Sequence, residues 1–330
     1  MLALSRSDVK RLVPMPEAIE LMKMAFVELS AGRATSPLRT VIDVNHDPSA
    51  MLIMPAYVPA AESLGFKVVS FFGGNPSRQL PTIQALVCLI DHENGAPLAI
   101  MEGSYVTALR TGAVSGAATD LLARSDSRVL TVIGAGAQGV TQAAAVCAVR
   151  PIERVIVVDA REDSFPHFLD AVQRDWPELA DRIETTTDVS AAVRAADIVC
   201  TATTSRQPVF DDADLRPGTH INAVGAFTPE MQEIPPATVV RATVVVDAID
   251  AILAEAGDLI IPLRQGLIDQ AHIARELGAV AAGAAPGRTR DDEITFFKSV
   301  GNAVQDVVVA RRAVDRARES RVGATIDLTA

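Results

Sequence analysis

The stretch Val129-Leu130-Thr131-Val132-Ile133-Gly134-Ala135-Gly136-Ala137-Gln138-Gly139 joins an apolar, β-branched run to the pattern Gly-x-Gly-x-x-Gly. The alanine-rich segment 140–149 that follows has helical character. A strand, a glycine-rich turn and a helix in this order form the fingerprint of a dinucleotide-binding unit. Gly134 permits the tight turn, Gly136 lets the backbone approach a pyrophosphate, and Gly139 lets helix and strand pack closely.

An acidic residue follows the next expected strand, 154–158, at the distance that this fingerprint requires. Asp159 comes 20 residues after Gly139, where a carboxylate would accept a hydrogen bond from a ribose 2′-hydroxyl. If the glycine-rich turn bound nothing, the presence of an acid at position 159 would be a coincidence. The sequence therefore predicts a nicotinamide cofactor, and Asp159 favours NAD. NADP stays open, because Arg161 would pair with its 2′-phosphate if Asp159 turned away.

The rest of the chain predicts two domains around this unit. Repeated strand and helix patterns from 129 onward predict a doubly wound parallel sheet of the Rossmann type. Antiparallel strand patterns before residue 102, with a turn at Asn94-Gly95, predict a separate α+β substrate domain. We place the substrate domain at 1–122, with 305–330 returning to it, and the Rossmann domain at 123–304. Phe296 to Ala303 is expected to open a final helix that runs to about Ala317.

Particular segments carry these expectations. Helices are expected at 16–30, 104–123, 140–149, 166–176 and 189–195. Strands are expected at 39–44, 50–57, 63–72, 83–91, 98–101, 129–133, 154–158, 183–187, 197–203, 219–225 and 243–247.

Composition excludes several classes of function. A net charge of −11 over 330 residues argues against nucleic acid and anionic membrane surfaces as partners. No apolar run is long enough to span a membrane, and the N-terminus lacks a signal pattern. The three cysteines lie far apart in apolar segments, which indicates reduced core residues rather than disulfides or a metal site. We therefore expect a cytoplasmic protein without a metal.

Three cations lie in contexts that are otherwise apolar or built from small residues. Arg39 starts an expected strand, Lys67 interrupts an apolar strand, and Arg110 lies in a helix of small residues. Each one alone has an ordinary explanation as a solvated or snorkelling side chain. Lys67 is the hardest to explain in this way, because burying an unpaired ammonium is costly. Together they suit a carboxylate-bearing substrate, since arginine binds carboxylates bidentately and a desolvated lysine can transfer a proton.

Two polar loops are expected to complete the cofactor cleft. They follow the strands that end near Thr201 and Ala223, and each offers backbone and hydroxyl groups, although ordinary turns have the same composition. No Gly-x-Ser-x-Gly, Cys-x-x-Cys or His-Glu-x-x-His pattern supports hydrolysis or metal catalysis. The cofactor-binding residues expected from the loops are Gly134, Gly136, Ala137, Gln138, Thr201, Ala202, Thr203, Val224 and Gly225.

Taken together, these motifs resemble the ornithine cyclodeaminase/mu-crystallin family along nearly the whole chain. The matching stretches are Met54-Pro55, Gly65-Phe66-Lys67-Val68, Asn75-Pro76, Leu80-Pro81-Thr82, Thr107-Ala108-Leu109-Arg110-Thr111-Gly112-Ala113, Gly134-Ala135-Gly136-Ala137-Gln138, Ala202-Thr203-Thr204-Ser205, Asn222-Ala223-Val224-Gly225 and Lys298-Ser299-Val300-Gly301. The resemblance implies a homodimer paired through the N-terminal domain, with Arg39 and Arg110 on the substrate carboxylate and Lys67 near the reacting carbon. It adds to the cofactor-binding set Thr82, Arg110, Thr111, Lys298, Ser299 and Gly301.

The family resemblance does not by itself choose the reaction. Cyclodeaminases of the family look like Gly-Gly-Asp-Cys-Pro where this chain has Gly225-Ala226-Phe227-Thr228-Pro229, and Phe227 cannot replace the acid/base aspartate. A glutamate expected two residues before Met54 is Leu52 here. The Gly-Ala-Phe-Thr-Pro form is similar to that of the ketimine-reductase branch.

The leading hypothesis is an NAD(P)H-dependent reductase of a ketimine or cyclic imino acid such as pyrroline-2-carboxylate. Arg39 and Arg110 would hold the carboxylate, Lys67 would relay a proton or stabilise charge, and Thr228 would hydrogen-bond a water or the imine nitrogen. Reductive amination of a 2-oxo acid, as in alanine dehydrogenase, is the first alternative. Ornithine cyclodeamination comes third, and non-enzymatic ligand binding, as in mu-crystallin, comes last.

Overall fold

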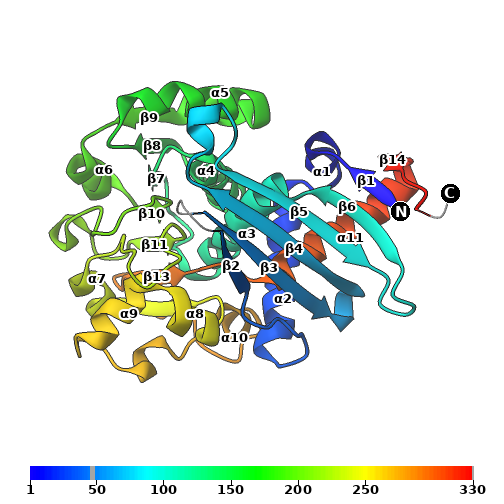
Figure 1. The fold of residues 1–330 in the computed structure, drawn as a ribbon. Helices are drawn as coiled ribbons and strands as arrows, with labels where there is room; N and C mark the ends of the chain where they lie inside the picture. The colour runs from blue at the N-terminus through cyan, green and yellow to red at the C-terminus, as the bar shows by residue number, and fades with distance from the viewer. Residues whose placement is uncertain (45–48, 329–330) are drawn as a thin grey trace. The chain divides into compact units, whose positions relative to one another are not determined.

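The computed structural model describes residues 1–44 and 49–328, which form two compact units (Figure 1). One unit contains Met1–Arg110 and the C-terminal residues from Asn302, and the other contains Thr111–Gly301. The first unit is therefore discontinuous in sequence. The substrate-binding and dimerisation roles that we assigned to it stay predictions.

The first unit is built on a mostly antiparallel sheet. Its described strands follow the order β14-β1-β6-β5-β4-β3-β2, and β1 pairs with β6 in parallel. The expected hairpin between β5 and β6 is present, and Gly95 takes a φ of +79° in its turn. The short strands β1 and β14 were not expected. The strands are β1 (Leu2–Leu4), β2 (Thr40–Val44), β3 (Ser49–Val58), β4 (Ser63–Phe72), β5 (Ile83–Ile90), β6 (Pro97–Glu102) and β14 (Ala324–Thr325).

Helices cover one face of this sheet. In Figure 1, α2 (Met15–Ser30) and α11 (Ala303–Ser320) lie behind the strands, and α11 packs against β3, β4 and β5. The side chains that face these helices form a buried row across the sheet, in which Met54, Lys67 and Val87 are register partners. The remaining helices of this unit are α1 (Arg6–Leu12) and the start of α3 (Gly103–Leu122).

The second unit is a parallel, doubly wound sheet of the Rossmann type. Its described strands follow the order β12-β13-β11-β10-β7-β8-β9, and every pairing is parallel. The order reverses between β7 and β10, which is where such sheets bind dinucleotides. The strands are β7 (Val129–Ile133), β8 (Arg154–Val158), β9 (Ile183–Thr186), β10 (Ile198–Thr201), β11 (His220–Ala223), β12 (Thr243–Val246) and β13 (Thr295–Lys298). The helices are α4 (Ala137–Val149), α5 (Phe165–Asp175), α6 (Val189–Ala195), α7 (Pro236–Arg241), α8 (Ile249–Glu255), α9 (Gly257–Arg264) and α10 (Leu277–Ala281).

One expected element is wrong. Phe296 to Ala303 does not open the last helix, because Thr295–Lys298 forms strand β13 and α11 begins at Ala303. A short apolar run fits a buried strand and a buried helix equally well from its pattern alone. Pairing decides the outcome here, since β13 lies between β11 and β12 and all its residues are buried.

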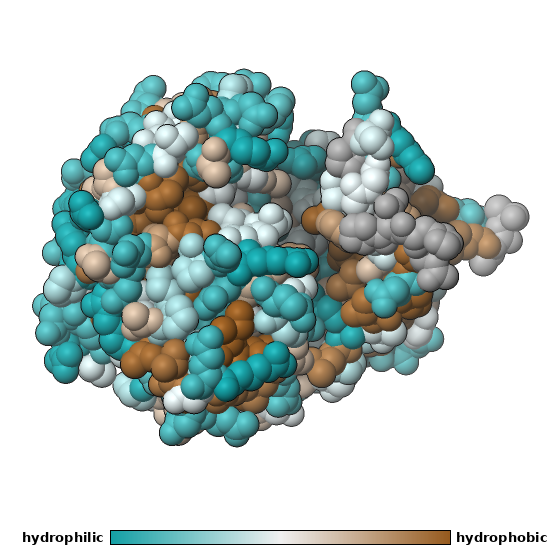
Figure 2. All heavy atoms as spheres, turned by 60° about the vertical axis from the view of Figure 1, so that its left-hand side comes forward, coloured by the Kyte–Doolittle hydropathy of each residue, from teal (hydrophilic) through white to brown (hydrophobic). Residues whose placement is uncertain are grey.

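Hydrophilic side chains cover much of the face shown in Figure 2, with apolar patches between them. Within the part of the chain that the structure describes, no helix is both long and apolar enough to cross a membrane. Cys200 is buried as expected, whereas Cys88 and Cys147 are half-buried, and all three are free thiols.

Candidate active site

The first unit holds a fully buried ion pair between Lys67 and Asp306. Lys67 lies in the middle of β4, and Asp306 lies in the first turn of α11, where the helix dipole favours a negative charge. The Lys67 Nζ is 3.0 Å from Oδ1 and 2.9 Å from Oδ2 of Asp306. The two side chains are 1% and 0% exposed. The burial expected for Lys67 is therefore present, and a carboxylate that the sequence reasoning missed compensates its charge.

Arg110 joins the same carboxylate from α3. Its Nε is 3.3 Å from the Asp306 Oδ1, and its Nη1 donates to the Gln305 Oε1 at 3.0 Å. One buried carboxylate thus faces two buried cations, and the field of Arg39 also reaches Lys67. The cluster of Lys67, Arg110 and Asp306 carries an excess of positive charge that an anionic ligand would neutralise.

This environment changes the proton affinity of Lys67. Desolvation, followed by repulsion from Arg110 and more weakly from Arg39, lowers the pKa of Lys67, which lies at about 7 once all its neighbours act together. Attraction to Asp306 works in the opposite direction and keeps the pKa from falling more. A lysine with a pKa near 7 can both donate and accept a proton at neutral pH, as general acid–base catalysis requires.

The glycine loop of the second unit has the geometry of a phosphate cradle. Gly134 takes a φ of +112°, and a Cβ at Gly139 would overlap the Gly134 carbonyl oxygen. A Cβ on Gly136 would have open space around it, and no side chain of the described residues caps the helix that starts there. The first turn of α4 therefore keeps N–H groups available for an anion. These residues fit the pyrophosphate of a dinucleotide.

Asp159 follows β8 and is fixed next to this loop. Its Oδ2 accepts from the Ala135 N–H at 2.9 Å, and its Oδ1 accepts from the Arg161 N–H at 3.0 Å. Each carboxylate oxygen keeps a lone pair for a further donor. The arrangement fits a ribose hydroxyl, and the Arg161 side chain is exposed.

The other predicted cofactor residues lie mostly at strand ends and on the loops that follow them. Thr201 ends β10, Ala202 and Thr203 follow it, and Val224 and Gly225 follow β11, so both groups lie at the carboxyl edge of the sheet. Buried atoms without a hydrogen-bond partner among the described residues include Thr201 Oγ1 and Gln138 Oε1. The remaining predicted residues are Thr82 between β4 and β5, Thr111 in α3, Thr228 after β11, and Lys298, Ser299 and Gly301 at the end of β13.

Two of these side chains are already engaged within the protein. Lys298 is fully buried, and its Nζ is 2.9 Å from the Asp258 Oδ2. The Ser299 hydroxyl donates to the Asp247 Oδ2 at 2.7 Å. Their assignment to the cofactor stays a prediction, and any contact by Lys298 or Ser299 would have to come from the backbone or share these bonds.

Sequence reasoning missed the acidic residues near Lys67 in the first unit and near Lys298 in the second unit. Gln305 and Asp306 interrupt a valine-rich run in α11, just as Lys67 interrupts β4, so the same rule would have found them. Glu233 lies in the connection between β11 and α7, whose composition is that of an ordinary loop, and Asp258 lies in the first turn of α9. No signal in the sequence distinguishes them.

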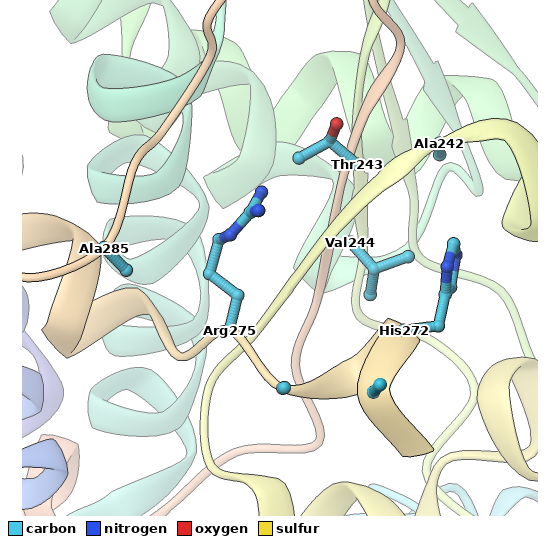
Figure 3. A pocket seen from close by; sticks show the side chains of 8 residues that line it. Ala242, Thr243, Val244, His272, Arg275 and Ala285 are labelled. Atoms are coloured by element: carbon cyan, nitrogen blue, oxygen red, sulfur yellow. The ribbon is translucent and has the colours of Figure 1, made fainter. Parts of the chain in front are cut away.

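A separate cavity in the second unit lies away from these residues. It has a volume of about 450 Å³ and opens beside Thr243 and Val244 at the start of β12, with His272 and Arg275 on its wall (Figure 3). The His272 ring hydrogen-bonds to the Val239 carbonyl oxygen at 2.7 Å. Dinucleotides bind at the carboxyl ends of parallel strands, whereas this cavity lies at the amino end of β12.

Comparison with known proteins agrees with the fold and with the motifs. The family model of the ornithine cyclodeaminase/mu-crystallin family matches residues 1–321. The chain belongs to the ornithine cyclodeaminase/mu-crystallin family. It is 41% identical to the Delta(1)-pyrroline-2-carboxylate reductase of Bacillus cereus, over 99% of this chain and 100% of that protein.

Solved structures of the family are similar along the whole chain. The Delta(1)-pyrroline-2-carboxylate reductase of Thermococcus litoralis, in complex with NADH and L-proline, has 43% identity and a TM-score of 0.93. The match covers 99% of this chain and 100% of that chain. An archaeal alanine dehydrogenase dimer with bound NAD has 34% identity and a TM-score of 0.91, over 99% of both chains. The Rossmann-type fold class is confirmed.

Proposed function

We propose that this chain is an NADH-dependent oxidoreductase that reduces a small cyclic imino acid, such as Δ1-pyrroline-2-carboxylate, to the amino acid. The observation that carries the proposal is the buried cluster of Lys67, Arg110 and Asp306, which has an excess positive charge and a proton carrier with a pKa near 7. The reductases of Bacillus cereus and Thermococcus litoralis, whose sequences match along the whole chain, support the same reaction.

The residues of the first unit would bind the substrate and supply its proton. Arg110 and Arg39 would hold the carboxylate, which fixes the orientation of the C=N bond. Lys67 would give one proton from Nζ to the imine nitrogen, and Asp306 would keep that ammonium in place. NADH supplies the hydride that adds to the imine carbon, so the products are the amino acid and NAD⁺.

The cofactor preference rests on Asp159. A carboxylate at the end of β8 accepts a bond from the ribose 2′-hydroxyl of NADH and repels the 2′-phosphate of NADPH. The hydrogen bonds from the Ala135 and Arg161 N–H groups hold it in place. A cytoplasmic location fits a reaction that consumes NADH.

The test is oxidation of NADH and of NADPH with Δ1-pyrroline-2-carboxylate, run beside pyruvate with ammonia and beside ornithine. We expect oxidation with the imine that needs no ammonia and is faster with NADH. Absence of turnover on cyclic imines would refute the proposal.

The likeness to an alanine dehydrogenase supports a second candidate. Reductive amination of a 2-oxo acid would use the same carboxylate-binding arginines and the same cofactor loop. It is distinguished by its dependence on ammonia, because the imine then has to form from free ammonia during each turnover.

The face of the first sheet that lies opposite α2 and α11 supports a homodimer paired through the first unit. Ile53, Val68 and Leu86 are register partners on the face opposite the buried row, and all three remain at least partly exposed. An exposed row of aliphatic side chains on a sheet is typical of a protein interface. Light scattering should give the mass of two chains, and Val68→Glu should shift it toward that of one.

A further inference from the structure

Glu233 is a fully buried carboxylate that connects two loops of the second unit. It lies between β11 and α7. Its Oε1 accepts from the N–H and the hydroxyl of Thr203, at 2.6 and 2.8 Å. Its Oε2 accepts from the N–H groups of Gly225 and Ala226, at 2.8 and 3.1 Å. One side chain thus fixes the backbone after β10 and the backbone after β11.

Two further buried charges hold Glu233 in place. The Asp258 Oδ1 accepts from the N–H groups of Glu233 and Ile234, at 2.6 and 2.9 Å. The other oxygen of Asp258 pairs with Lys298 at 2.9 Å. Burial raises the pKa of Glu233, while the positive charge of Lys298 lowers it. The four groups that contact the carboxylate are donors, which fits its ionised form.

The loops that Glu233 connects are next to the glycine loop. β10 pairs directly with β7, and a Cβ on Gly134 would meet the Ala202 carbonyl oxygen. In a doubly wound sheet the dinucleotide crosses the point where the strand order reverses. The adenosine half would lie on the side of β7 and β8, where Asp159 follows the second strand. The nicotinamide half would then lie over the loops after β10 and β11.

Gly225 shows how closely the carboxylate approaches this backbone. A Cβ at Gly225 would overlap the Glu233 Oε1 and the Thr203 carbonyl oxygen. The two loops and the carboxylate are packed without space for a side chain between them. A change at Glu233 therefore acts directly on the position of both loops.

We propose that Glu233 is a positioning residue for the nicotinamide half of the cofactor, because it fixes the loops 201–205 and 223–226 in the conformation that receives it. The inference depends on the proposed function only for the identity of the cofactor. It concerns the second unit alone and assigns Glu233 no contact with the reacting atoms.

The test compares a complete and a truncated cofactor on the Glu233→Gln variant. The glutamine amide would place N–H donors against N–H donors, so at least one loop loses its anchor. We expect the dissociation constant of NADH to rise about tenfold or more, while that of ADP-ribose, which lacks the nicotinamide, stays the same. Glu230→Gln, an exposed change in the same connection, is the matched control.

The dissociation constants of NADH and ADP-ribose are both measured without an imine substrate, so a wrong substrate assignment does not affect them. An equal loss of affinity for NADH and ADP-ribose would show a purely structural role and overturn the proposal. Unchanged NADH affinity in a folded Glu233→Gln protein would overturn it as well. If that variant does not fold, Asp258→Asn decides in the same assay, because it weakens the support of Glu233 and should again affect NADH alone.

Discussion

Replacing Asp306 by asparagine should change the pH dependence of the reaction. Asparagine has the same shape, but it cannot neutralise the two cations that the carboxylate contacts. Of the groups that act on Lys67, Asp306 raises its pKa, whereas Arg110 and Arg39 lower it. The Asp306→Asn variant therefore keeps only the lowering interactions with charges, and the pKa of Lys67 must fall below about 7.

The size of the shift follows from the burial of the pair. Removing one partner of a buried ion pair costs about 3–5 kcal/mol, and one pKa unit corresponds to about 1.4 kcal/mol. A fall of about two pKa units is therefore a conservative expectation. At pH 7.5 the protonated fraction of Lys67 would then decrease by about 80-fold. If the ammonium donates the proton, kcat/KM should decrease by a similar factor.

The assay is the pH profile of kcat/KM for imine reduction. In the wild type, activity should be full below the pKa of Lys67 and fall as the pH rises through about 7. In Asp306→Asn the same decrease should occur at a lower pH, and a melting curve should show a folded but less stable protein. Asp315→Asn is the control, since Asp315 lies on the same helix and pairs with Arg311 at the surface.

One result would refute this reasoning. If a folded Asp306→Asn protein kept its midpoint near pH 7, Asp306 would not set the proton affinity of the group that titrates. Lys67 would then not be the proton carrier that the pH profile reports.

Further predictions concern the two sites separately. Lys67→Ala and Arg110→Ala should abolish turnover and leave the NADH dissociation constant nearly unchanged, because both residues belong to the first unit; loss of NADH binding would contradict this. Asp159→Ala should raise the preference for NADPH by about tenfold, measured as the ratio of kcat/KM values, and an unchanged ratio would exclude Asp159 as the selector. Gly139→Ala should lower the melting temperature, since its Cβ overlaps a backbone carbonyl, whereas Gly136→Ala should weaken NADH binding at an unchanged melting temperature.

Local patterns were enough to predict most of the elements. The apolar runs of β4, β7 and β8 predict strands because each is bounded clearly enough to exclude a helix. The run Thr295–Lys298 is only four residues long, and its neighbours β11 and β12 decide its structure. Such pairing between distant segments leaves no trace in the run itself.

The cations of the candidate site could be predicted from the sequence. Lys67 and Arg110 stand out because a cation in an apolar segment needs a reason. Their counter-ion is 239 residues from Lys67 along the chain, and only the fold shows that they meet. The role of Glu233 could not be predicted for another reason. It depends on four hydrogen bonds from two loops and not on the residues next to Glu233 in the sequence.

The division of the first unit between the two ends of the chain also determines the order in which the protein can fold during synthesis. The strands β2 to β6 leave the ribosome early, but α11, which covers them, is made only after the whole second unit. Until then Lys67 and Arg110 have no Asp306, and the sheet lacks the helix that buries it. The second unit, continuous from Thr111 to Gly301, can fold on emergence. The buried cluster of Lys67, Arg110 and Asp306 is therefore the last part of the first unit to be completed.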